Sequence, residues 1–413
     1  VAVLVIAAVR TLSGPVFDRL AISVLVILGL GVGVQELMGV LAAGSIGMEF
    51  NFRISLLHFS WPRFFNQMQS WTLPVLAALP ALFCRRPLAQ VLCICVIGLN
   101  WYVLLMTGAR GTVVGIFSAF AIILFLFPTA RRETAKWHVA GLALGAIIYI
   151  AVLVWIDASN PAVGSETPTT QASGTNAPKD VNPTSTGPSP AQNSFYNQSL
   201  GREMLNTSGR WWMWKRLLQD VQAHPWLGIG PMNYACKGRL NEAGHPHNFP
   251  LQVAGEWGLA AALVLMVMMA SLARSALKKL RNGAFDSDSE HFLAILLAAG
   301  VITAGVHACL SGVLVMPASQ LTGALICGWL LGILTPSSAP GTIRTMNQTG
   351  NGQGPTNAFL ALMLIINLTV LTFSIREVGL REETFASTKI GDRLIPRFWQ
   401  NGKACGLPAS EAP

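Results

Sequence analysis

The segments SGRWWMWKRLLQDVQAHPWLGIGP (residues 208–231) and HPHNFPLQVAGEWG (residues 245–258) decide how the rest of the chain is interpreted. The first predicts a helix that starts near Gly209 and stops at the His-Pro step, because Ser and Thr before it favour helix caps and Pro ends helices. The second places two histidines directly before a hydrophobic helix. Together they predict an arginine-bearing helix, a Gly/Pro turn and a histidine pair on one working face at a membrane surface.

The composition indicates the fold class. Of the 413 residues, 52% are hydrophobic and 11% are charged, whereas soluble domains carry roughly 25% charged residues. We therefore expect an all-α polytopic membrane protein, and the net charge of +9 indicates orientation and anionic headgroups and not nucleic acid. A crossing needs about 20 apolar residues. The candidate runs are 21–43, 72–83, 88–106, 112–127, 137–156, 249–272, 292–315, 318–334 and 359–373, and a helix end at 1–9 brings the expected number to about ten.

Lys and Arg in short loops set the orientation. Basic residues are concentrated in the loops around residues 10–19, 85–86, 131–136 and 274–281, so we place these loops in the cytoplasm. The long insert between the fifth and sixth runs then faces the periplasm. The predicted organisation is transmembrane helices in 1–156, a periplasmic loop in 157–248, transmembrane helices in 249–374 and a tail in 375–413. Within the loop, 157–194 is rich in Ser, Thr, Pro and Gly and is expected to be flexible, while 195–248 is expected to be ordered and catalytic.

The helix after Gly209 has an informative face. At 100° per residue, Arg210, Trp214, Leu217 and Val221 share one side, so Arg210 lies among large apolar groups while Arg216 on the opposite side is solvated. Two readings stay open. The helix is either an interfacial helix with a tryptophan belt and snorkelling arginines, or it presents Arg210 to a ligand.

His247 precedes a helix for which Asn248 is a good N-cap and Pro250 suits the first turn. The positive end of the helix dipole disfavours an imidazolium there, so a neutral His247 suits a general base; a simple polar cap residue is the competing reading. His245 lies two positions earlier, but no third metal ligand is evident. Glu256 either orients His247 or pairs with a cation.

Other polar groups lie on the same predicted side of the membrane. In the stretch TGARG (residues 107–111), glycines flank Arg110, which suits close approach and bidentate binding of phosphate or marks a turn at the headgroups. Arg63 and Gln67 add a cation and an amide. Glu36 and His307 are ionisable groups in apolar helices, where functional roles are frequent. The acidic pair in residues 286–288 resembles a metal-binding motif of nucleotide-sugar transferases, but it falls in a cytoplasmic loop and is interpreted as a polar turn.

The chain resembles the O-antigen ligase and O-antigen polymerase family of bacterial inner-membrane proteins. The motifs that carry the resemblance are SGRWWMWKR (208–216), HPWLGIGPMNY (224–234) and HPHNFPLQVAGEWG (245–258). The GARG turn and the run RFFNQMQSWTLP (63–74) are similar to ligase-type members. The resemblance implies a GT-C-type bundle of about 10–12 transmembrane helices in the Gram-negative inner membrane, with its active site facing the periplasm.

The resemblance also implies an activity. A metal-independent glycosyltransferase without a cofactor would move a glycan from undecaprenyl pyrophosphate to a sugar hydroxyl of lipid A–core, with the bilayer as its third partner and no nucleic acid. The family's His-Asn step maps onto His247 and Asn248, so His247 is the implied base, and the loop arginine maps onto Arg210. The residues implied to bind the donor pyrophosphate are Arg110, Arg239, Arg216 and Arg63, and those implied to support the site are Asn248, His245, Glu256, Gln67 and Trp214.

Three alternatives remain open at this point. The same fold serves O-antigen polymerases and oligosaccharyltransferases that act on protein Ser or Thr. A transporter or lipid flippase would use the loop as a lid, but we find no paired broken helices or internal repeats. A structural membrane scaffold would leave the clustered His and Arg residues without a role.

Overall fold

The computed structural model describes residues 1–45, 62–83, 86–159, 210–231, 233–235, 245–283 and 285–335. In these ranges the regular structure is helical throughout. The elements are α1 (Ala2–Ser13), α2 (Pro15–Ser45), α4 (Pro62–Thr72), η1 (Val75–Ala78), α5 (Leu79–Leu82), α6 (Pro87–Thr107), α7 (Arg110–Leu126), α8 (Pro128–Ser159), α10 (Arg210–Ala223), η4 (Asn233–Ala235), α11 (Phe249–Asn282), α12 (Asp288–Ala308) and α13 (Pro317–Leu334).

Six of the described helices are long and apolar enough to cross a membrane, namely α2, α6, α8, α11, α12 and α13. The helices α1 and α7 are apolar but shorter. These findings confirm an all-α polytopic membrane protein. The expected ten to twelve crossings are not reached within the described ranges, and the predicted run 359–373, the tail 375–413 and almost all of the arm 157–194 lie outside them.

Proline sets the start of many of these helices. Pro15, Pro62, Pro87, Pro128 and Pro317 are each the first residue of a helix, a position where the missing amide costs nothing and the fixed φ favours a helix. This explains why α8 begins nine residues before the apolar run that predicted it. The charged first turns of α8 make the helix longer than its apolar run, which hydropathy alone does not show.

The run 72–83, which is short enough that we expect it to begin near Phe64, does not form one continuous helix. The helix α4 ends at Thr72, a turn follows, and the chain continues as the one-turn elements η1 and α5. Pro74 and Pro80 remove two backbone donors, and each ring disfavours helical geometry in the preceding residue. The apolar residues are buried nonetheless, because residues 73–80 line the core against α12.

Glycines bring three helix pairs close together, namely α6 with α8, α7 with α12 and α1 with α13. A β-carbon added at Gly145 of α8 would lie 2.6 Å from the Gly98 carbonyl oxygen of α6, and one at Gly115 of α7 would lie 2.5 Å from the Thr303 carbonyl oxygen of α12. The same holds for Gly332 of α13, where the distance to the Ala7 carbonyl oxygen of α1 would be 2.8 Å. Small residues that let backbones approach are the usual basis of helix packing in lipid.

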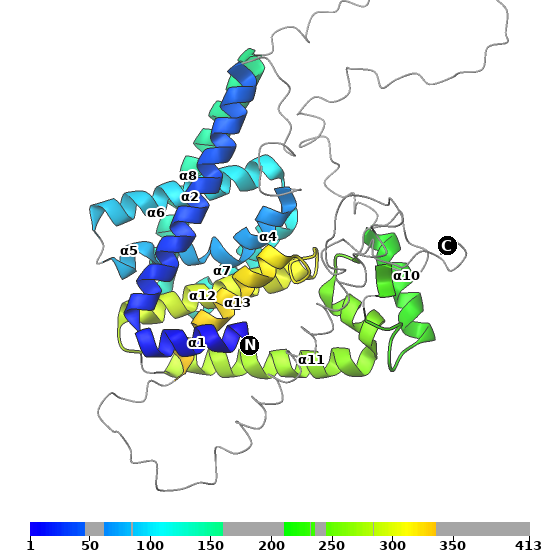
Figure 1. Ribbon diagram of the computed structural model, residues 1–413. Coiled ribbons are helices and arrows are strands. Elements are labelled where there is room, and N and C mark those ends of the chain that lie inside the picture. The colour runs from blue at the N-terminus through cyan, green and yellow to red at the C-terminus, as the bar shows by residue number, and fades with distance from the viewer. Residues whose placement is uncertain are drawn as a thin grey trace, which may run out of the picture.

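The helix α12 lies at the centre of the bundle, in contact with α4, α7, α11 and α13 (Figure 1). The helices α2 and α8 run side by side past α6, whereas α11 lies along one edge with α10 beside its N-terminal part (Figure 1). Exposed apolar side chains cover much of α11, for example Val264 at 67% and Leu263 at 58%. Such a surface is suited to face lipid.

An ionic cluster joins four helices at the N-terminal end of α12. Arg10 of α1 donates from Nε to Asp18 Oδ1 of α2 at 2.9 Å and from Nη2 to Asp18 Oδ2 at 3.0 Å, and its Nη2 also contacts Glu290 of α12. The Trp329 indole of α13 donates to Asp18 Oδ1 at 2.7 Å. Burial makes such a cluster costly to break by removing one partner.

Candidate functional site

The site is built where the loop after α10 docks onto a break in α11. Gly258 interrupts α11 with φ 86° and ψ 169°, so the carbonyl groups before the break lose their helical partners. The Gly255 and Glu256 carbonyl oxygens accept instead from the amides of Ile229 (2.9 Å) and Gly230 (3.0 Å). In return, the amide of Leu259 donates to the Pro225 carbonyl oxygen at 2.7 Å. The HPWLGIGP loop thus completes the backbone hydrogen bonds of α11.

Packing between α10 and α11 depends on a second glycine. The buried residues of α10 are Met213, Leu217 and Val221, and a β-carbon at Gly255 would lie 2.2 Å from Leu217 Cδ1. Leu217 and Val221 therefore form the expected buried face. Helical periodicity also predicts Trp211 and Leu218 on this face, but they are 63% and 45% exposed while Met213 is buried, so this part of the prediction was wrong.

Glu256 is tied to the docked loop. It is 4% exposed, and its Oε1 accepts from the Tyr234 amide at 3.2 Å, while its Oε2 accepts from Gln252 Nε2 at 3.4 Å. These bonds connect α11 to η4. Glu256 therefore helps to hold the loop that carries the turn after α10.

The His-Pro-His turn is fixed from both sides. Asn248 caps α11 as predicted, because its side chain accepts from the Leu251 amide at 3.0 Å. The Trp214 indole of α10 donates to the Pro246 carbonyl oxygen at 2.8 Å. His247 has φ 57°, in the left-handed region, which turns the chain sharply into α11 and sets the direction of the imidazole.

His245 is enclosed beneath this turn. It is 5% exposed, its ring centroid lies 4.2 Å from that of His247, and a β-carbon at Gly312 would lie 2.0 Å from its Nε2. Burial lowers the pKa of His245 to about 4, so its ring is neutral near pH 7. His245 therefore acts as an uncharged support that packs between His247 and the α12–α13 turn.

Arg210 and Arg110 act on one another across 100 residues of sequence. Arg210 is the first residue of α10 and Arg110 the first residue of α7. Burial, followed by the positive charge of Arg110, lowers the pKa of Arg210. Arg210 is partly buried and Arg110 is exposed, and two like charges within electrostatic range of one another favour an anion between or beside them.

A buried polar network on α4 lies behind the arginines. Asn66 Nδ2 donates to Gln69 Oε1 at 2.8 Å and to Thr107 Oγ1 at 2.9 Å, so α4 is joined to the end of α6 beside the GARG turn. Gln67 Nε2 donates to Ser311 Oγ at 3.3 Å, next to the glycine that His245 packs against. The amides of the FNQMQS run therefore position the ends of α6 and α12 around the candidate site.

His307 belongs to this network. The sequence alone identified it only as an ionisable residue in an apolar helix. Its Nδ1 lies 2.7 Å from Ser70 Oγ and 3.4 Å from Thr112 Oγ1. Its ring packs against Gly111, where a β-carbon would lie 2.5 Å from Cδ2. Gly111 therefore makes room for His307, whereas Gly108 has nothing within 4 Å of an added β-carbon.

The structure does not place every predicted site residue. Arg239 and the side chain of Arg63 lie outside the described residues. Arg216 is partly buried, and its guanidinium lies 5.2 Å from the ring centroid of Trp212, so the expected fully solvated side chain was wrong. Within the described residues, no group of three His, Cys, Asp or Glu side chains is placed to hold a metal ion.

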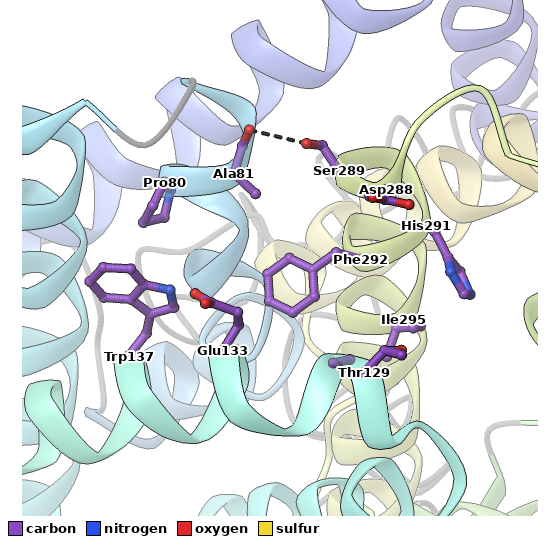
Figure 2. Close-up of a pocket in the computed structure, with 11 residues that line it drawn as sticks. Pro80, Ala81, Thr129, Glu133, Trp137, Asp288, Ser289, His291, Phe292 and Ile295 are labelled. Atoms are coloured by element: carbon purple, nitrogen blue, oxygen red, sulfur yellow. Dashed lines mark hydrogen bonds between the residues drawn. The ribbon is translucent and has the colours of Figure 1, made fainter.

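A cavity of about 670 Å³ opens near the N-terminal end of α12, between α5 and α8. Figure 2 shows Glu133 and Trp137 rising from α8 on the side of Pro80, with the Phe292 ring of α12 beside Glu133. His307 lies 15 residues beyond Phe292, which is roughly 22 Å along a helix. The cavity is therefore remote from the arginines and histidines and does not belong to the candidate site.

The acidic turn before α12 has a structural role. Ser287 caps the helix, because its Oγ accepts from the Glu290 amide at 3.2 Å. Asp288 stands in the first turn of α12, where a carboxylate interacts favourably with the helix dipole. The interpretation of residues 286–288 as a polar turn agrees with this arrangement.

Residues 94–277 match the model of a protein family described as O-antigen ligase. The matched residues include the GARG turn, α10, the docked loop and the His-Pro-His turn. Neither the comparison with curated proteins nor that with solved structures gives a match. Over residues 94–277 the chain is therefore similar to O-antigen ligases.

Proposed function

We propose that this chain transfers a glycan from undecaprenyl pyrophosphate to a sugar hydroxyl of lipid A–core at the periplasmic face of a Gram-negative inner membrane. The family match supports glycosyltransferase activity of the ligase or polymerase type, and the six apolar helices support a multi-pass membrane protein. The lipid-linked donor, the acceptor, the GT-C architecture and independence from metal are the finer parts of the proposal.

The observation that carries the proposal is the pairing of Arg210 with Arg110. Two cations that repel each other are held near one another by separate helices, and burial adds to the cost of the Arg210 charge. An arrangement of this kind gains energy when an anion is bound. A pyrophosphate with two or more negative charges satisfies that requirement at the level of the lipid headgroups.

His247 is proposed as the general base of the reaction. The acceptor oxygen forms a bond with the anomeric carbon of the donor glycan, the bond from that carbon to the pyrophosphate oxygen breaks, and the hydroxyl proton moves to the imidazole. Undecaprenyl pyrophosphate departs as an anion that Arg210 and Arg110 stabilise. The link between the two parts is Trp214, one helical turn after Arg210, which bonds to the residue before His247.

The supporting residues have distinct roles in this proposal. Asn248 caps α11, His245 packs against His247, Glu256 holds the docked loop, and Gln67 fixes the α12 end. Trp214 keeps α10 and the His-Pro-His turn together. These contacts hold the base and the arginines in one geometry before the substrates arrive, which is a requirement for efficient transfer.

The test is a reconstituted transfer assay with purified protein, lipid-linked glycan and chelator, offered lipid A–core, a Ser/Thr peptide or no acceptor. The base is removed with His247→Asn, because Asn tolerates a left-handed backbone better than Ala and so preserves the turn. The matched control is His224→Ala, since the side chain of His224 is exposed at the end of α10.

The expected result is transfer to lipid A–core by the natural protein and by His224→Ala, with a loss of about 10²–10⁴-fold in His247→Asn. Transfer to peptide, or extension of the donor glycan, would move the chain to the oligosaccharyltransferase or polymerase alternatives. Full activity of folded His247→Asn would remove His247 as the base. Movement of the donor lipid across the bilayer without transfer would favour a flippase.

A further inference from the structure

His307 occupies a position that the proposed reaction does not yet use. It lies in the last turn of α12 and is 5% exposed. One side of its ring faces the hydroxyls of Ser70 and Thr112, and the other side faces Gly111. It thus stands between the polar network of α4 and the N-terminus of α7, where Arg110 begins the helix.

The hydrogen bonds around His307 indicate which ring nitrogen carries the proton. Thr112 Oγ1 donates to the Asn66 carbonyl oxygen at 3.1 Å, which uses its only proton. Ser70 Oγ lies 3.1 Å from the same carbonyl oxygen but only 2.7 Å from Nδ1, so its proton is better placed for Nδ1, and the shorter separation is typical of a bond from a hydroxyl donor. With Nδ1 as the acceptor, the neutral ring carries its proton on Nε2.

Nε2 lies on the side of the ring that faces the start of α7. A β-carbon at Gly111 would lie 2.8 Å from Nε2, so this nitrogen lies against the residue that follows Arg110. The charge of Arg210 acts on the same ring. The Nε2–H group therefore lies at the start of α7, one residue from Arg110 and within range of the charge of Arg210.

We propose that His307 is a third contact to the donor pyrophosphate, through an Nε2–H that Ser70 holds in place from the opposite side of the ring. This inference rests on the proposed function. A neutral donor suits this position, because a third cation would be repelled by both Arg110 and Arg210. An imidazole N–H adds a hydrogen bond without added charge. The anion that departs is then bound from three helices, α7, α10 and α12, of which α7 and α12 cross closely at Gly111 and Gly115.

The test uses two substitutions that imitate different halves of the imidazole. His307→Asn keeps a polar group near the Nδ1 position for Ser70 but removes the donor near Nε2. His307→Gln reaches the Nε2 position with an amide that can still donate. The matched control is His291→Asn, the same change on the same helix, 16 residues and roughly 24 Å away.

Apparent KM values for the lipid-linked donor and for lipid A–core are measured for each variant after folding is checked by size-exclusion chromatography. We expect His307→Asn to raise the donor KM by about tenfold or more, as for loss of a hydrogen bond to a charged group. His307→Gln should recover most of that loss. The acceptor KM should stay unchanged in both, and His291→Asn should match the natural protein.

The inference is overturned if His307→Asn folds and keeps the natural donor KM, or if Asn and Gln raise donor and acceptor KM equally, as a purely structural role would. If neither variant folds, Ser70→Ala decides: an increase of about threefold in donor KM alone supports the inference, and no change overturns it. Absence of transfer by the natural protein would refute the proposed function first, so the two failures are distinguishable.

Discussion

Replacement of Gly258 by Ala tests whether the docked loop organises the site. The residue has φ 86° and ψ 169°, a backbone conformation that is essentially restricted to glycine and costs other residues about 1–3 kcal/mol. A β-carbon would also lie 2.0 Å from the Trp226 carbonyl oxygen and 2.8 Å from the Leu227 amide nitrogen. Because both atoms belong to the backbone, the loop must move.

The free energy of docking follows from the bonds that would be lost. Ile229, Gly230 and Leu259 donate the three backbone hydrogen bonds between the loop and α11, each with a net contribution of about 1 kcal/mol. Added to the strain, the substitution weakens docking by about 4–6 kcal/mol. A change of 4.1 kcal/mol corresponds to about 10³-fold in the docked population, so we expect transfer to fall by at least about 100-fold.

Hydrogen exchange measured by mass spectrometry on the purified protein would follow the amides of Ile229 and Gly230, alongside the transfer assay. Exchange should rise in Gly258→Ala in peptides that cover the loop, with α6 and α12 unchanged. The matched control is Gly31→Ala on α2, because nothing lies within 4 Å of a β-carbon added there. If Gly258→Ala shows the same hydrogen exchange and the same transfer activity as the unsubstituted protein, the docked loop does not organise the site.

Three further predictions concern the supports of the site and of the bundle. Trp214→Phe removes the donor to the carbonyl between the two histidines, and we expect transfer to fall about fivefold at unchanged donor KM, as for one neutral hydrogen bond; a change in donor KM alone would contradict this. Burial lowers the pKa of His245 to about 4, so between pH 6.5 and 4 only the unfolded chain binds a proton at this residue. The free energy of unfolding should therefore keep its full value above pH 6.5 and fall by of order 3 kcal/mol toward pH 4. Unfolding titrations in detergent at several pH values should show that the free energy of unfolding depends less steeply on pH in His245→Leu. An unchanged pH dependence would disprove the lowered pKa of His245. Asp18→Asn leaves the buried Arg10 without its bidentate partner, and we expect a loss of about 3 kcal/mol in the same titrations; natural stability would mean that Glu290 compensates.

Local signals in the sequence predicted the parts of the fold that depend on nearest neighbours. The cap at Asn248 and the end of α10 at the His-Pro step follow from residues within one helical turn. The break of α11 at Gly258 could not be predicted in this way. A glycine inside an apolar run is compatible with a continuous helix, and what favours the break is a loop some 30 residues earlier that supplies the replacement hydrogen bonds.

The candidate site shows the same division. Arg110 and Arg210 were both chosen from the sequence, but their proximity depends on how α7 and α10 meet in space, which neither hydropathy nor helical periodicity contains. His307 is a clearer case, because a histidine in an apolar helix has no partner in its own sequence neighbourhood. Its relation to the site comes from the crossing of α7 and α12 at Gly111 and Gly115.

The helix α12 explains why distant substitutions should have separable effects. Its N-terminal end is held by the contact of Glu290 with Arg10, and its C-terminal end by the contact of His307 with Ser70. Both ends lie in a buried environment, so both are expected to contribute to stability, but only the C-terminal end lies beside the arginine pair. If α12 acts as a rigid support, Asp18→Asn should lower stability at an unchanged donor KM, whereas His307→Asn should raise the donor KM. An equal rise of donor KM in both variants would instead show that the ionic cluster sets the geometry of the site through the helix.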